Sequence, residues 1–269
     1  MPELPEMENY RRLLNEKIRG KTIINVEVTR EKSVNLDVKR FREEVQGSKI
    51  TGVERRAKYL IFKLDSGKNL LLHLMLGGLI YLDLGNDEID RTKQVTLSFG
   101  NLNLFFIGLR LGFLHLLSNE ELEKTLSELG PEPLDPSFSI QVFQQVIAKR
   151  RGVLKSTLVN QKFLAGIGNL YSDEICFEAK LLPKKKISDL VDEEKIELYK
   201  SIQSILLRGI ILGGYMELPV FKGDKVTGRY NDNCYVYDRE GESCHRCNGV
   251  IVRDKISSQK SFYCPLCQT

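Results

Sequence analysis

Four cysteines near the end of the chain restrict its fold more than any other sequence feature. They form two Cys-x-x-Cys pairs, made by Cys244, Cys247, Cys264 and Cys267. Four thiolates at this spacing are typical of a closed, tetrahedral zinc site. Two disulfides are the alternative, but the opening residues are unlike a secretory signal, and disulfides are rare in the cytosol. The pattern therefore predicts one structural Zn²⁺, with no coordination position open for catalysis, that stabilises a zinc finger.

Periodic patterns in the rest of the chain predict an α+β protein. Apolar residues at helical spacing predict a helix over residues 3–19, and β-branched stretches after it predict a mostly antiparallel β-sandwich. The predicted strands cover 22–29, 59–64, 69–75, 79–84, 94–99 and 102–107. A Gly-Pro-Glu-Pro linker at 130–133 precedes the predicted helices, which cover 137–150, 153–160, 170–180 and 191–212. The predicted domains are 1–130 (catalytic-type sandwich), 131–233 (helical, with a recognition loop at 215–233) and 234–269 (zinc finger).

The first residues of the chain, Met-Pro-Glu-Leu-Pro-Glu, have a possible chemical role. If Met1 is removed, Pro2 carries a free secondary amine, and an α-amino group with a pKa near ~8 is partly nucleophilic at neutral pH. Glu3 and Glu6 follow within one turn and could move protons. The alternative is that proline and glutamate here only begin a helix. Retention of Met1 would leave the Pro2 nitrogen acylated and unreactive.

Cations and glycines elsewhere indicate contact with phosphates. The stretch Arg-Arg-Ala-Lys-Tyr ends in Lys58 and Tyr59 and places three cations near the start of a predicted strand. A Gly-x-Gly-Asn turn ending in Gly168 and Asn169 precedes a predicted helix, where backbone N–H groups can approach a phosphate. Solvated strand ends and ordinary tight turns are the alternatives. The net charge of +4 is compatible with nucleic acid, and the sequence has no apolar run long enough for a membrane span.

Together these motifs resemble the formamidopyrimidine-DNA glycosylase/endonuclease VIII family of bacterial base-excision repair enzymes, over the whole chain. The resemblance implies a helix–two-turn–helix domain beside the zinc finger, and a monomer that binds damaged or distorted double-stranded DNA in the bacterial cytoplasm, at the nucleoid. It also implies that Pro2 displaces the damaged base and holds the sugar as an iminium. Glu3 would then be the proton shuttle, Glu6 its supporting carboxylate and Lys58 the lysine between phosphate and base. Strand cleavage by β-elimination would follow.

The same resemblance implies phosphate contacts for Lys155 and Asn169, and it also exposes departures from the family pattern. The family inserts a Met and an Arg and Phe into the gap left by the flipped base. In this sequence the Met position is Leu76, and the Arg-Arg-Phe positions are Leu109, Arg110 and Leu111. A leucine can wedge apart a base step but cannot read a base edge, so this region predicts altered lesion recognition.

The zinc finger departs from the family as well. The position of the phosphate-gripping arginine is occupied by Gln259, with Lys260 one residue further along. A lysine supplies a point charge instead of the bidentate fork of an arginine.

Three functions therefore stay open. The first is a DNA glycosylase with abasic-site lyase activity and an altered lesion range. The second is a non-catalytic relative that binds distorted, gapped or branched DNA, which the departures at Leu109, Leu111 and Gln259 favour. The third, which only the generic cysteine pattern favours, is a zinc-ribbon module for RNA or protein.

Overall fold

The computed structural model describes residues 1–85, 87 and 89–269. Their contacts divide the chain into two compact units. The first unit contains Met1–Pro2, Glu6–Glu128 and Gly213–Gly228. The second contains Glu3–Pro5, Leu129–Leu212 and Arg229–Thr269. Each unit is thus built from several separate segments of the chain, whereas each domain predicted from the sequence is one continuous segment. The predicted domain boundaries stay a prediction. No described helix has an apolar stretch long enough to cross a bilayer.

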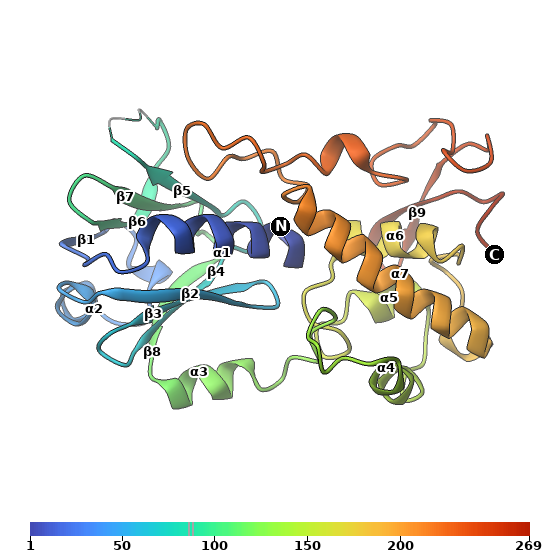
Figure 1. Ribbon diagram of the computed structural model, residues 1–269, viewed down its shortest axis with the longest axis horizontal. Coiled ribbons are helices and arrows are strands. Elements are labelled where there is room, and N and C mark those ends of the chain that lie inside the picture. The colour runs from blue at the N-terminus through green and yellow to red at the C-terminus, as the bar shows by residue number, and fades with distance from the viewer. Residues whose placement is uncertain (86, 88) are drawn as a thin grey trace. The chain divides into compact units, whose positions relative to one another are not determined.

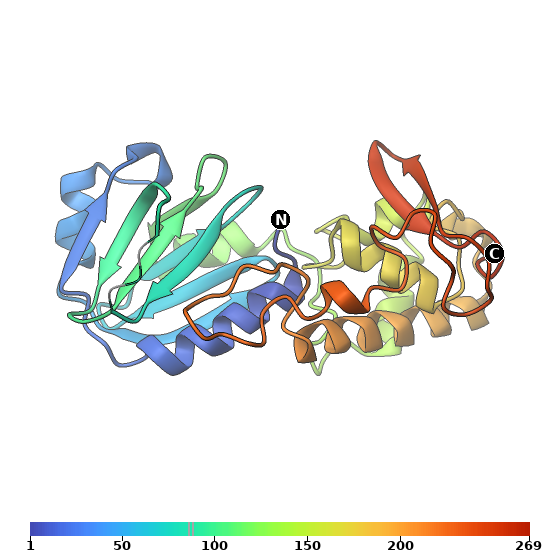
Figure 2. The same ribbon diagram turned by 90° about the horizontal axis from the view of Figure 1, so that it is seen from above.

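The first unit contains two four-stranded antiparallel sheets (Figures 1 and 2). One sheet has the order β1-β6-β7-β5 and the other β2-β3-β4-β8. The strands are β1 (Asn25–Val28), β2 (Ile50–Arg56), β3 (Tyr59–Leu64), β4 (Asn69–His73), β5 (Leu79–Asp83), β6 (Lys93–Ser98), β7 (Asn103–Ile107) and β8 (Phe113–Leu117). The helices are α1 (Leu4–Ile18, which belongs to this unit from Glu6 onward), η1 (Glu31–Ser33), α2 (Val38–Val45) and α3 (Asn119–Leu126).

A single apolar core joins the two sheets and helix α1. Alternating residues of both sheets contribute to it, and Phe62 of β3 meets Phe106 of β7 edge to face with 6.0 Å between ring centroids. Helix α1 supplies Met7, Leu14 and Ile18, each fully buried, together with the nearly buried Tyr10. Their helical spacing is the reason that the sequence predicts this helix, and the structure confirms it.

Residues 213–228, which we call the return segment, belong to the first unit although they follow a helix of the second. The Val220 side chain is fully buried in the sandwich core, and the Leu82 N–H of β5 donates to the Val220 carbonyl at 2.7 Å. At its far end, Asn9 of α1 donates to the Thr227 hydroxyl at 2.7 Å. The predicted recognition loop is therefore held on the sandwich along part of its length.

The second unit consists of helices and a zinc-finger hairpin. Its elements are α4 (Ile140–Ile147), α5 (Leu154–Leu158), α6 (Asn169–Glu178), η2 (Ile187–Asp189), α7 (Asp192–Ile211), η3 (Asn231–Asn233), β9 (Val252–Ile256) and β10 (Gln259–Tyr263). Helix α6 is buried on nearly all sides, including Asp173 and Glu174, both fully buried. Phe177 of α6 packs against the finger residues Ile251 and Phe262. Helix α6 is therefore the structural centre of this unit.

The sequence does not predict the described elements α2, α3, β2 and β8, nor the short helices η1, η2 and η3. The signal for α3 is readable, because Ser118 and Glu121 form a capping box at its start. Strand β2 contains a glycine and an irregular register between Ile50 and Gly52, which breaks the alternation that identifies strands. The predicted strands 59–64 and 69–75 are confirmed as β3 and β4, which pair as an antiparallel hairpin. The four predicted helices are confirmed as α4 to α7.

Candidate active site and zinc centre

Glu3 caps the first turn of helix α6 in the second unit. Its two carboxylate oxygens accept the N–H of Gly168 at 2.5 Å and the N–H of Leu170 at 3.0 Å. A Cβ at Gly168 would lie 2.4 Å from the Glu3 carboxyl carbon, so only glycine leaves room for this contact. The positive end of the helix dipole favours a carboxylate in this place. Because the Gly168 N–H donates its hydrogen bond to Glu3, the structure does not support the predicted contact between this N–H and a phosphate.

Pro2 and Glu6 belong to the first unit, where Pro2 is buried. Glu6 is 2 % exposed, and its Oε1 atom accepts the N–H of Tyr215 at 2.7 Å. Gly214 has a φ of +80° and leaves no space for a side chain, because a Cβ there would lie 2.5 Å from the same oxygen. The Glu6 carboxylate, which the resemblance predicts to support Glu3, thus also binds the backbone at the start of the return segment.

Lys58 lies in the tight turn between β2 and β3, directly before the first residue of β3, so its predicted place at a strand start is confirmed. Its side chain is 6 % exposed. The preceding Ala57 has a φ of 52°, and Arg55 braces the turn by donating to the Ala57 carbonyl at 3.2 Å. Arg55 also pairs with Glu8 of α1 at 3.0 Å. The cationic stretch is therefore divided, with Arg55 used for structure and Lys58 held in a rigid turn.

Lys58 influences His73, the last residue of β4. Burial and the nearby Lys58 ammonium lower the pKa of His73 from 6.5 to about 4. The ring of His73 stacks on Tyr59 with 4.4 Å between centroids and lies 5.9 Å from Phe113. His73 is thus neutral at physiological pH and directly precedes the loop that carries Leu76.

This lowered pKa predicts a loss of stability in acid. The unfolded chain protonates His73 near pH 6.5 but the folded protein only near pH 4, so protons favour unfolding as the pH falls between these values. We expect His73 to contribute about 2–3 kcal/mol to the free energy of unfolding above pH 6.5, and to lose this contribution progressively toward pH 4. Urea unfolding measured from pH 7 to pH 4 should show a steeper decline for the parent protein than for His73→Phe, which keeps the ring stack. Parallel curves would contradict the assignment.

Asn169 begins helix α6 and forms a pair with a tyrosine that the sequence does not single out. Its Nδ2 atom donates to the Tyr237 hydroxyl at 3.4 Å, and among the described residues none donates to its buried Oδ1 atom. Burial raises the pKa of Tyr237 to about 12, so the phenol stays protonated and can donate. Amide and hydroxyl groups at a helix N-terminus are among the groups with which proteins bind phosphates.

Glu174 fixes the segment that carries Tyr237, a role that the sequence analysis did not find. Its carboxylate accepts the N–H groups of Tyr235, Val236 and Tyr237 at 2.8–3.0 Å and the Tyr230 hydroxyl at 3.0 Å. Four donors satisfy the buried charge. The available signal is a pair of adjacent acids, Asp173 and Glu174, inside a helix that is otherwise mostly apolar.

Lys155 does not lie where the resemblance suggests. Its side chain is 0 % exposed, and its ammonium donates to the Asn169 carbonyl at 2.6 Å and to Asp173 Oδ1 at 2.8 Å. Helices α5 and α6 enclose it, and the Asp173 carboxylate offsets part of the cost of removing the ammonium from water. The structure therefore does not support a direct phosphate contact by Lys155, although it brings Lys155 next to Asn169.

The predicted insertion residues separate into exposed and buried ones. Leu76 and Leu111 are 64 % and 61 % exposed, and Arg110 is exposed as well. Leu109 is fully buried in the sandwich core, and its N–H donates to Gln94 at 3.2 Å. The prediction that Leu109 contacts DNA needs correction, since the core and not the surface holds this side chain.

Glycines hold the two loops that carry the exposed leucines against each other. A Cβ at Gly108 would lie 2.2 Å from the Gly77 carbonyl oxygen, and one at Gly112 would lie 2.4 Å from the His73 carbonyl oxygen. The loops 74–78 and 108–112 therefore form one rigid surface that presents Leu76 and Leu111.

The tip of the zinc finger carries Gln259 and Lys260 on strand β10, after a turn in which Ser257 and Ser258 have φ values of 49° and 67°. Lys260 is exposed, whereas the Gln259 Oε1 atom is buried and no described residue donates to it. The tip thus offers the exposed cation Lys260, with the exposed Lys255 opposite it on strand β9.

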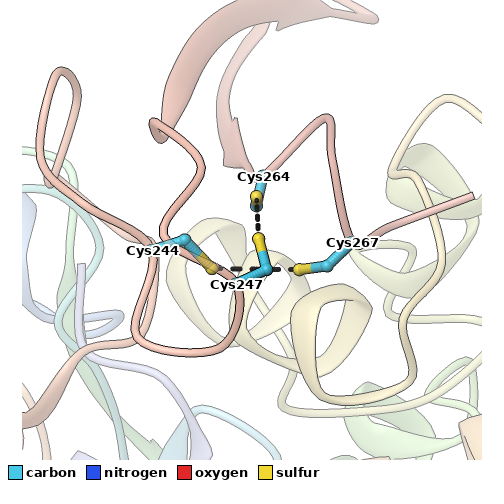
Figure 3. Close-up of side chains that lie close together, drawn as sticks. All are labelled: Cys244, Cys247, Cys264 and Cys267. Atoms are coloured by element: carbon cyan, nitrogen blue, oxygen red, sulfur yellow. Dashed lines mark hydrogen bonds between the residues drawn. The ribbon is translucent and has the colours of Figure 1, made fainter.

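The four predicted zinc ligands converge in the second unit (Figure 3). Their sulfurs all lie within 4.8 Å of one another, with 3.8 Å between Cys244 and Cys267 and 3.5 Å between Cys247 and Cys264. A tetrahedral zinc with Zn–S bonds of about 2.3 Å requires sulfur–sulfur distances of about 3.8 Å. Gly249 leaves room for the cluster, because a Cβ there would lie 3.2–3.3 Å from two of the sulfurs. The residues fit one structural zinc, as the sequence predicts.

Comparisons with known proteins cover the whole chain. The formamidopyrimidine-DNA glycosylase N-terminal domain matches residues 1–113, the formamidopyrimidine-DNA glycosylase H2TH domain residues 129–217, and the zinc finger found in FPG and IleRS residues 241–269. The formamidopyrimidine-DNA glycosylase of Carboxydothermus hydrogenoformans is 36% identical over 272 residues, and that of Heliobacterium modesticaldum 37% identical over 276; each match covers 100% of both chains.

Solved structures agree with this assignment. A complex between the Lactococcus lactis Fpg and an abasic site containing DNA matches with a TM-score of 0.92 at 31% identity, over 99% of each chain. A second complex of that protein, with a Fapy-dG containing DNA, has a TM-score of 0.91 at 31% identity and covers 99% of this chain. The predicted α+β fold is confirmed, and the chain belongs to the formamidopyrimidine-DNA glycosylase family.

Proposed function

We propose that the protein is a bifunctional DNA glycosylase and abasic-site lyase that removes oxidised bases through the amine of Pro2, after loss of Met1. The observation that carries the proposal is the capping of helix α6 by Glu3, in the same unit as the Asn169–Tyr237 pair. The similarity to formamidopyrimidine-DNA glycosylases along the whole chain supports it.

The proposed chemistry uses groups of this chain alone. The Pro2 lone pair attacks C1′ of the everted nucleotide, the C1′–base bond breaks, and its electron pair leaves with the base, which takes up a proton. The amine nitrogen, now bonded to C1′, passes its proton to the Glu3 carboxylate. Its lone pair then forms the iminium as the C1′–O4′ bond breaks, and Glu3 gives the proton to O4′. Removal of a C2′ proton expels the 3′ phosphate by β-elimination. The two N–H groups that Glu3 accepts keep its carboxylate oriented for this exchange.

We also assign the DNA contacts. Asn169 and Tyr237 would bind a phosphate beside the everted nucleotide, and Lys58 would neutralise charge near the sugar. A base must leave the stack before the Pro2 amine can reach its sugar. Leu76 and Leu111, exposed on their rigid loops, would fill the gap left by that base.

The residues that differ from the family pattern are those that would recognise the base opposite the lesion. An arginine that pairs with the orphaned base gives a discrimination of about 1–3 kcal/mol, which neither Leu76 nor Leu111 can supply. Leu109, at the arginine position, is buried. We therefore propose a glycosylase with weak dependence on the opposite base.

Borohydride trapping tests the proposal. Met-processed protein is incubated with duplexes that contain an oxidised purine opposite each of the four bases, or an abasic site, and is then reduced. We expect a covalent protein–DNA band in every case, with rates that differ by less than about fivefold among the opposite bases. A strong preference for one opposite base would assign reading to another group, with the exposed Arg110 the first to substitute.

A specific observation favours a second function: Leu109, Leu111 and Gln259 stand where the family has a base-pairing arginine, a stacking phenylalanine and a phosphate-binding arginine. A non-catalytic member of the family would bind distorted or branched DNA without cutting it. Absence of the covalent band, together with tighter binding to abasic or junction DNA than to intact duplex in a band-shift assay, would favour this function over catalysis.

A further inference from the structure

A buried ion pair lies behind the proposed phosphate site and has no role in the chemistry described above. Lys155 of α5 and Asp173 of α6 are both 0 % exposed, with 2.8 Å between Nζ and Oδ1. Removing two charges from water is costly, and an apolar pair of similar volume usually stabilises a fold equally well. A buried ion pair of this kind therefore contributes more to the positions of the segments that it joins than to the free energy of unfolding.

Each member of the pair holds a different part of the second unit. Lys155 also donates to the Asn169 carbonyl at 2.6 Å, at the first residue of helix α6. Asp173 also accepts the Ser261 hydroxyl at 2.6 Å and the Phe262 N–H at 3.0 Å, both from strand β10 of the zinc finger. A continuous chain of hydrogen bonds thus runs from Asn169 to the finger.

The contact with β10 determines how the tip of the finger is presented. Side chains alternate along a strand, so when Ser261 faces Asp173 the neighbouring Lys260 must face away. Ser261 is 0 % exposed and Lys260 is exposed, as this alternation requires. A shift of β10 by one residue would bury the cation and expose the serine.

We propose that Lys155 and Asp173 are positioning residues that align the zinc finger with the first turn of helix α6. In this arrangement Asn169 and Lys260 act as one phosphate-binding surface, and Lys155 acts through Asn169 without touching DNA. The inference rests on the proposed function only in naming DNA as the ligand of that surface.

The test compares four variants of the full-length zinc-loaded protein. Ser261→Ala removes one bond to Asp173, and its control, Ser201→Ala, makes the same change at a serine on α7 that is 1 % exposed. The double variant Lys155→Met/Asp173→Leu replaces the pair by apolar side chains, and its partner Lys155→Met leaves Asp173 unpaired. The readouts are affinity for a duplex with a stable abasic-site analogue at several salt concentrations, urea unfolding, and hydrogen exchange in residues 168–173 and 259–263.

We expect Ser261→Ala to weaken DNA binding about five- to tenfold and to lower the salt slope, because Lys260 loses its place, while Ser201→Ala binds like the parent. Lys155→Met should unfold at lower urea. The double variant should recover the unfolding midpoint but still bind DNA at least about fivefold more weakly, with faster exchange in both segments.

Recovery of both stability and affinity by the double variant would show that the pair only fills space, and would overturn the proposal. An affinity of Ser261→Ala for DNA equal to that of the parent protein would also overturn the proposal. If the parent protein fails to bind the duplex, the proposed function fails, and the exchange data alone then decide whether the pair couples the finger to helix α6. Coupled faster exchange in both segments supports the proposal, and unchanged exchange overturns it.

Discussion

Blocking the Pro2 nitrogen should slow release of an oxidised base at least about 10³-fold and abolish the borohydride adduct. One extra residue before Pro2 converts its amine to an amide, which has no lone pair available for attack. A positioned nucleophile is worth an effective molarity of about 10⁵–10⁸ M, so a large loss is expected even if water can still react slowly. Single-turnover base release and strand cleavage by the blocked and Met-processed proteins measure the effect, with intact mass spectrometry to verify each N-terminus.

The blocked protein is its own control for binding. Because Asn169, Tyr237 and the finger are unchanged, its affinity for a stable abasic-site analogue should stay within about threefold of the processed protein. Equal base release by the two proteins would exclude Pro2 as nucleophile. It would direct attention to Lys58, the other amine in the first unit that the sequence assigns to catalysis.

Loss of the zinc should unfold the finger and weaken DNA binding at least about 100-fold. Structural zinc contributes an apparent free energy of about 10–16 kcal/mol in small zinc domains, which a short hairpin cannot replace. The finger also anchors helix α6, since Arg246 donates to the Phe177 carbonyl at 2.7 Å and Ser261 to Asp173. Cys264→Ser should therefore lose stoichiometric zinc, exchange rapidly over residues 244–269 and fail to retain abasic DNA.

Cys234→Ser is the matched control, because Cys234 is 3 % exposed and lies outside the cluster. It should keep one zinc per chain and bind DNA like the parent, with a cost in stability of about 1–2 kcal/mol. Retention of zinc and DNA affinity by Cys264→Ser would contradict a structural role of the metal.

Local sequence patterns predict some features of the site but not others. The cysteine spacing, the helical stripe of α1 and the Gly-x-Gly-Asn turn are properties of a few neighbouring residues, and each is found in the structure where the sequence predicts it. The environment of a single polar or apolar side chain is different, because it depends on segments far away in the chain. Lys155 shows this: its charge suggests a phosphate, but Asp173, 18 residues later, makes its burial possible.

Leu109 and Leu111 show the same limit from the apolar side. Both are leucines in one short loop, yet one is 0 % and the other 61 % exposed, because the close contact of the loop with Gly77 and His73 decides which of them the core receives. Glu174 and Tyr237 could not be identified for the same reason, since their hydrogen bonds join residues 56 to 68 positions apart.

The sequence by itself determined the zinc ligands and most helices and strands, because spacing and short-range periodicity encode them. Its motifs also resemble one family closely enough to identify it, and the catalytic residues that this resemblance implies stay a prediction. Only the tertiary structure decided which charged groups are buried as braces and which leucines face the solvent. Those outcomes depend on long-range packing, where the desolvation of a charge must be matched by a partner that no local pattern identifies.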